Sequence, residues 1–93
     1  MAACPILTTA PRQWWRTRVE KILAERDALA AEEDARGARA AVREAHQALV
    51  AASSEGERRA AAAKCRELVG VFQSAERAAD HAWRRFCRTL DDR

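Results

Sequence analysis

The chain is poor in the residue types that interrupt helices. Among its 93 residues there are only three glycines and two prolines, and tyrosine and asparagine are absent. Alanine, arginine and glutamate are abundant instead, which is typical of long helices. The glycines are isolated, so the chain has no glycine-rich loop that could cradle a phosphate group. At this length we expect one domain with a modest core.

Long apolar runs are also lacking. The longest internal uncharged run, Ala45–Ser54, is too short and too polar to span a bilayer. The first ten residues, Met1–Ala10, have neither a basic region nor a long apolar run, so they do not resemble a secretory signal. We therefore expect no membrane association and a cytoplasmic location, with export by a route that lacks a cleavable signal as the alternative.

Cysteine occurs an odd number of times, as Cys4, Cys65 and Cys87. If residues 65 and 87 lie on one helix, they are about 33 Å apart, which is too far for a disulfide bond. We interpret these cysteines as small apolar side chains in a reducing compartment, in agreement with a cytoplasmic location.

The dominant pattern is an apolar seam in the last third of the chain. Apolar residues recur there in alternating steps of four and three, which places them on one face of a helix over about four heptads. Charged residues fill the positions between them. This C-terminal seam consists of Ala61, Cys65, Leu68, Phe72, Ala75, Ala79, Ala82, Phe86 and Leu90.

Residues 10–52 contain no strong helix breaker beyond the first turn and carry two apolar sets in the same rhythm. We start this helix near Ala10, because Pro11 is tolerated in a first turn. The two sets lie on different faces, so the apolar stripe is expected to change face near Leu29–Ala31. The main prediction is one long helix; the alternative is a break near Asp34–Gly37, which gives three helices. The first set is Trp15, Val19, Ile22 and Leu29, with Arg26 filling the position between the last two, and the second is Ala31, Ala35, Ala38, Val42, Ala45, Leu49 and Ala52.

The turn between the two helices is the clearest local signal. Ser54 is followed three residues later by Glu57, which is the spacing of a capping box, where each side chain accepts a hydrogen bond from the other residue's backbone N–H. Continuing the earlier rhythm past Ala52 would place Gly56 and Arg59 on the apolar face, which also favours a turn. The alternative is one uninterrupted helix that pairs with a second chain.

We therefore predict an all-α, antiparallel, coiled-coil-like hairpin of two helices that forms a single domain over residues 1–93. Its parts are an extended lead-in (1–9), a first helix (10–52), a turn (53–56) and a second helix (57–91). Folding about residue 55 places alanine against alanine over much of the length, which buries little area at ~25 cal/mol per Å². We expect the chain to form a homo-oligomer when no other partner is bound.

Signals for catalysis are weak. The two histidines, His46 and His81, fall far apart in the hairpin, and His46 with nearby Cys65 supplies only two of the ligands that a zinc site needs. Ser74 and Asp80 share a helix with His81, where neighbours rarely converge as nucleophile, base and orienting group. We predict no enzyme activity, no metal and no cofactor.

All three tryptophans fall near the free ends of the two helices, together with a concentration of arginine. Tryptophan and arginine are enriched in binding hot spots. The competing interpretation is that these large side chains close the end of an alanine-walled hairpin. Trp14 and Trp15 are about 100° apart on a helix, so at least one should be partly exposed or covered by another chain. The candidate partner-binding residues are Trp14, Trp15, Arg16, Arg18, Trp83, Arg84, Arg85 and Arg88.

The charge balance favours a protein partner over nucleic acid. The chain has 17 basic and 14 acidic residues, so its net charge is only +3 and well mixed. The acidic run 32–34 would repel a phosphate backbone lying along the whole rod. We expect a non-catalytic protein–protein interaction module that docks an apolar helix face or its Trp/Arg-rich end. The alternative is a small helical subunit that contacts nucleic acid or a ribonucleoprotein through that end.

Two resemblances accompany this interpretation. With Ser54-Glu55-Gly56 at the turn, the outline is similar to that of small secreted hairpins that carry a Trp-x-Gly turn, but the defining tryptophan is absent here. In composition, the helical part resembles the co-chaperones and stalk proteins of bacterial export systems. We therefore expect an adaptor, an export-type chaperone or a small inhibitor that occupies a partner's groove.

Overall fold

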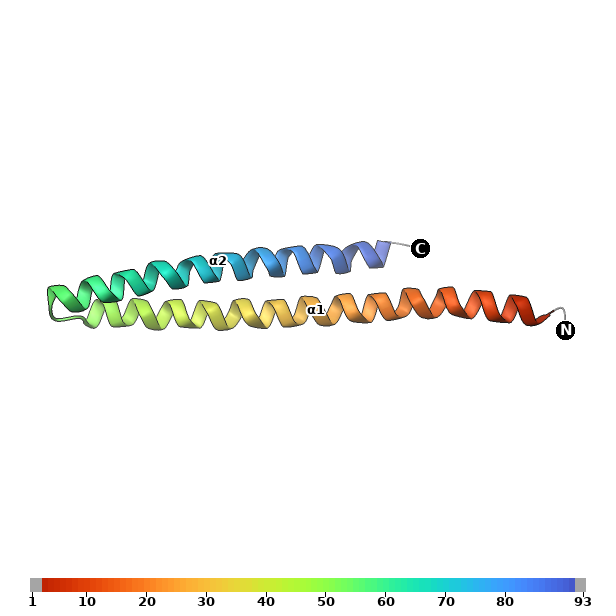
Figure 1. The fold of residues 1–93 in the computed structure, drawn as a ribbon, viewed down its shortest axis with the longest axis horizontal. Coiled ribbons are helices and arrows are strands. Elements are labelled where there is room, and N and C mark those ends of the chain that lie inside the picture. The colour runs from red at the N-terminus through yellow and green to blue at the C-terminus, as the bar shows by residue number, and fades with distance from the viewer. Residues whose placement is uncertain (1–2, 92–93) are drawn as a thin grey trace.

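Two long helices joined by a tight turn make up residues 3–91 of the chain (Figure 1). The computed structural model describes residues 3–91, with side chains from residue 14 onward. Helix α1 spans Ala3–Ala51, and helix α2 spans Glu55–Asp91 and packs antiparallel against it. The hairpin predicted from the sequence is confirmed. The molecule is a rod of 82 × 17 × 13 Å, and its radius of gyration is 22.3 Å against about 12 Å for a compact domain of this length.

Helix α1 is continuous through Gly37, so the three-helix alternative is wrong. A single glycine weakens a helix by only about 1 kcal/mol, and good helix formers surround this one. The helix also begins at Ala3, whereas we expected residues 3–9 to be extended. Pro5 lies in the first turn, where a proline lacks only an N–H that has no partner within the helix, whereas Pro11, expected in the first turn, lies in the interior and removes one backbone hydrogen bond without ending the helix.

The turn is held by a variant of the predicted capping box. The Glu57 N–H donates to Ser54 Oγ over 3.1 Å, as the sequence indicated. The Glu57 carboxylate, however, accepts from the backbone N–H of Ser53 over 3.1 Å, one residue earlier than expected. With Ser54 as the capping residue, α2 starts at Glu55, so Glu55 and Gly56 belong to the helix and not to the turn. No glycine between residues 3 and 91 has a positive φ.

Small residues line the contact between the helices. The C-terminal seam on α2 is half-buried at every position through Phe86, whereas Leu90 is exposed. On α1, the most buried side chains are those of Ala24, Ala28 and Ala45. Among the described residues, no large side chain is fully buried. An alanine seam lets two helices approach closely but removes little apolar area from water.

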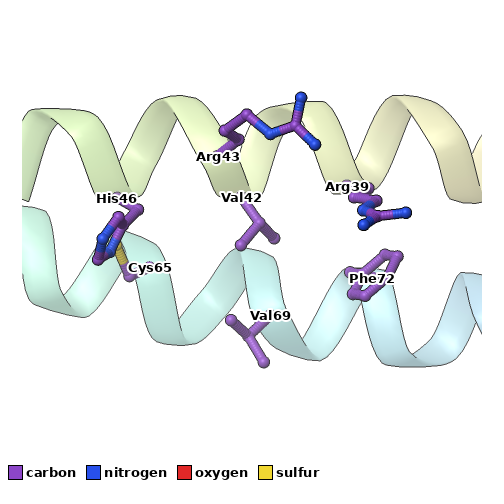
Figure 2. A pocket seen from close by; sticks show the side chains of 7 residues that line it. All are labelled: Arg39, Val42, Arg43, His46, Cys65, Val69 and Phe72. Atoms are coloured by element: carbon purple, nitrogen blue, oxygen red, sulfur yellow. The ribbon is translucent and has the colours of Figure 1, made fainter.

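The register follows from the residues that face each other across the two helices. Near the turn, the numbers of opposing residues add up to 111, close to the 110 expected from the sequence. Extended along the rod, this register places Asp91, the last residue of α2, at the level of Glu20 on α1. The opposing pairs in Figure 2 are Arg39 with Phe72, Val42 with Val69, and His46 with Cys65.

Candidate functional site

An apolar stripe lies on the side of α1 that faces away from α2. Its members stand nine residues before the alanines of the contact seam, as Trp15 does before Ala24 and Val19 before Ala28. Nine residues turn a helix through about 900°, so the two members of each pair point in opposite directions. Trp15 is 58% exposed, whereas Ala24 is 3% exposed. We define the α1 stripe as Trp15, Val19, Ile22 and Leu29, with Leu23 on its flank; all five are exposed.

The residue pattern identifies this stripe, but the prediction that it packs against the second helix is wrong. We expected the stripe to form the contact in the first half of α1, and the seam to change face near Leu29–Ala31. The seam instead continues on one face through Ala24 and Ala28. Alanines allow the helix backbones to approach closely, whereas a row of large side chains would hold them apart. The signal was present, since Ala24 and Ala28 extend the four–three rhythm that begins at Ala31.

Trp14 and Trp15 lie beyond the end of α2. The register ends near Glu20, and Figure 1 shows α1 continuing past α2. Both tryptophans are more than half exposed. Their rings meet edge to face, with centroids 5.7 Å apart, and the guanidinium of Arg18 lies 5.1 Å from the centroid of the Trp14 ring. Such contacts each contribute only about 0.5–1.5 kcal/mol.

Trp83 belongs to a second aromatic cluster, on α2. Its ring lies 5.8 Å from that of Phe86, and both side chains are half-buried. In the register, Trp83 lies at the level of Ala28, which is about 20 Å along the rod from Trp15. The sequence suggested that the eight candidate residues form one patch. The structure does not bring them together. They divide into a group on α1, with Trp14, Trp15, Arg16 and Arg18, and a group on α2, with Trp83, Arg84, Arg85 and Arg88.

The basic residues of these groups differ in their partners. Arg84 forms an ion pair with Asp80 one turn earlier, with 3.0 Å between Nη2 and Oδ2. Arg16, Arg85 and Arg88 make no ion pair or hydrogen bond through their side chains to any residue within the described range. An exposed ion pair such as Arg84–Asp80 contributes little to the stability of the fold. The unpaired guanidinium groups are therefore the ones free to meet another molecule.

A shallow groove runs between the helices in the half of the rod nearer the turn (Figure 2). Its volume is about 460 Å³, and it is open to solvent. Val42 of α1 and Val69 of α2 lie at the same level along it. His46 and Cys65 meet at one end but supply two ligands only, and the described part of the chain contains no group of three or more residues placed to hold a metal ion. The groove is lined by Arg39, Val42, Arg43, His46, Cys65, Val69 and Phe72.

Neither helix, over the residues described, has a segment both long enough and apolar enough to cross a membrane. Cys65 and Cys87 are both free thiols on α2, half-buried and exposed respectively.

Comparison with known proteins gives no match. No family model matches the chain, and no significant match is found among curated proteins or among solved structures.

Proposed function

We propose that the chain is a non-catalytic protein–protein interaction module that works by docking the α1 stripe against a helix or groove of another polypeptide. The observation that supports this most directly is the exposure of the five stripe residues on the face opposite the intramolecular contact. An amphipathic helix that presents anchors at steps of three and four residues is a common mode of protein recognition. An adaptor, an export-type chaperone and a small inhibitor would all work in this way.

The position of the stripe supports the same proposal. Because it faces away from α2, a partner can reach it without separating the hairpin. Trp14 contacts Trp15 of the stripe and Arg18 lies over the Trp14 ring, and tryptophan and arginine are the residues most enriched in binding hot spots. The hairpin then acts as a rigid support that keeps α1 helical before binding, which lowers the entropy cost of association.

The distribution of chemically reactive side chains favours binding over catalysis. His46 lies near the turn, whereas the register places His81 at the level of residue 30, about 24 Å away along the rod. A nucleophile and a base need to lie within hydrogen-bond reach of each other.

We also propose a cytoplasmic location, because Cys65 and Cys87 are free thiols on one helix and cannot form a disulfide bond with each other within a chain.

Affinity purification with matched variants tests the proposal. Ile22→Glu places a charge in the middle of the stripe, and Val50→Glu places the same charge on α1 at a residue that is 75% exposed and far from the stripe. We expect polypeptides that bind the wild-type chain to be lost with Ile22→Glu and kept with Val50→Glu. If both variants capture the same polypeptides as the wild type, further copies of this chain counted among them, the proposal is wrong.

A second candidate is binding to nucleic acid through the arginines and tryptophans. It is favoured by Arg16, Arg85 and Arg88, whose guanidinium groups have no carboxylate partner within residues 14–91. Phosphate binding weakens steeply with salt, whereas apolar docking does not. Fluorescence anisotropy with a labelled oligonucleotide at low and at physiological salt therefore separates the two. Tight, salt-sensitive binding that survives Ile22→Glu would favour the nucleic-acid function.

A further inference from the structure

The hairpin exposes more surface than a compact protein of its mass. Its accessible surface is 7544 Å², whereas a compact monomer of 10.4 kDa exposes about 5,400 Å². The excess of roughly 2,100 Å² is larger than the ~800 Å² that each partner buries in an interface of standard size. The chain therefore has enough surface for a stable interface, and the α1 stripe contributes five of its exposed large apolar side chains, Trp15, Val19, Ile22, Leu23 and Leu29.

Two residues of opposite charge flank the stripe on the same side, Arg18 before Ile22 and Glu25 after it, and Arg26 occupies a position within the stripe between Ile22 and Leu29. Neither Arg18 nor Glu25 makes an ion pair within the described part of its own chain. A helix that runs antiparallel to α1 and is centred near Ile22 would place an arginine opposite each of the two glutamates.

We infer that the α1 stripe is the interface of an antiparallel homodimer whose two-fold axis passes close to Ile22. This inference rests on the proposed function and names its partner: a second copy of this chain. In that arrangement Ile22 meets Ile22 of the second copy, and Leu23 lies beside the same axis. Trp15 lies against Leu29 of the second copy, since the two residues are seven positions before and after the axis.

Charge pairs select the antiparallel arrangement. Arg18 and Glu25 lie seven residues apart, so they share one flank of the stripe. The two-fold axis brings Arg18 of each copy opposite Glu25 of the other, and this happens twice per dimer. A parallel pair in the same register would place arginine beside arginine and glutamate beside glutamate. Like charges at such positions repel, which disfavours the parallel dimer.

The resulting dimer is a layer of four helices with the two α1 helices in the centre. Each α2 lies outside, because the stripe and the α2 contact occupy opposite sides of α1. Docking therefore covers the stripe without disturbing the intramolecular seam. It leaves the groove near the turn and the Trp83 group open for contacts with other molecules.

The first test is the mass of the purified wild-type chain by analytical ultracentrifugation. We expect a dimer at micromolar concentration, and monomers for Ile22→Glu with unchanged helical circular dichroism. Val50→Glu, the control, should remain dimeric. A wild-type monomer at 50 µM, or a dimer that Ile22→Glu leaves intact, overturns the inference. If the wild-type chain is monomeric but still binds another protein through the stripe, only the identity of the occupant is wrong and the proposed function stands.

Charge reversal tests the register without removing apolar contacts. Arg18→Glu and Glu25→Arg each turn two attractive pairs into two repulsive ones, so each variant alone should dimerise at least ~10-fold more weakly. The double variant restores both pairs and should dimerise as the wild type does. In a parallel dimer the double variant would only exchange one repulsion for another. Failure of the double variant to recover therefore overturns the antiparallel register.

Intermolecular distances provide a further check on direction. Asp34 lies twelve residues after the axis, so spin labels at this position in a cysteine-free variant should be about 36 Å apart in the antiparallel dimer. A parallel dimer brings the labels within about 20 Å of each other. A distance in that shorter range, from a sample that is dimeric by mass, overturns the inference.

Discussion

Ala28 and Leu29 are neighbours on α1, and it is the smaller side chain that the fold buries. Ala28 is 0% exposed against α2, whereas Leu29 is 51% exposed on the α1 stripe. This choice keeps the two helices close together and leaves the larger apolar surface for another molecule. It also means that the hairpin and its proposed interface can be altered independently.

The first prediction concerns Ala28 itself. Ala28→Leu should lower the free energy of unfolding by about 1–3 kcal/mol, because the larger side chain has no space against α2. Ala30→Leu, at an exposed position on the same turn, is the matched control and should change stability little. Urea unfolding followed by circular dichroism measures both. Equal stability of the two variants would show that the helices are not closely packed at this level.

Gly37 offers a stabilising change. A Cβ atom built on Gly37 meets nothing within 4 Å, and the residue is exposed in the middle of α1. Gly37→Ala should therefore raise the free energy of unfolding by about 0.5–1 kcal/mol through the higher helix propensity of alanine. Gly70→Ala, which is equally open on α2, should give a similar gain. A loss of stability at position 37 alone would indicate that the protein uses a bend there.

The capping box predicts a third outcome. Ser54→Ala removes the acceptor for the Glu57 N–H and should lower stability by about 1 kcal/mol. Ser74→Ala is the control: this serine lies within α2, where its Oγ only accepts a 3.3 Å bond from Arg77. We expect that variant to be neutral or slightly more stable. Thermal unfolding of the two variants side by side is the measurement, and an equal melting temperature would contradict the capping role.

Trp83 and Trp14 should respond differently to truncation. Trp83 is half-buried beside Phe86 and α1, so Trp83→Ala should lower the free energy of unfolding by about 2 kcal/mol. Trp14 has no turn of α2 opposite it, and Trp14→Ala should change stability by less than about 0.5 kcal/mol. Denaturant titration gives both values. A large loss with Trp14→Ala would show that this tryptophan is part of the folded support and not of an exposed surface.

Much of this architecture can be read from the sequence because it depends on local rules. The steps of four and three in the C-terminal seam fix which face of α2 is buried, and every position through Phe86 is half-buried as expected. The Ser54–Glu57 spacing fixes where α2 begins, since an unpaired N–H at a helix terminus needs a nearby acceptor. These features require only the geometry of a single helix.

The tertiary structure decided which of two apolar faces on α1 meets α2. Ala24 and Ile22 both belong to rhythms of four and three, and hydrophobicity alone favours the larger side chain. Close approach of two backbones favours the smaller side chain, and this packing contribution to stability arises only when the second helix is in place. The unequal lengths of the helices, 49 and 37 residues, likewise left Trp14 and Trp15 about 20 Å from Trp83. Distances along a rod depend on where each helix begins and ends. Residue patterns predict those boundaries only approximately.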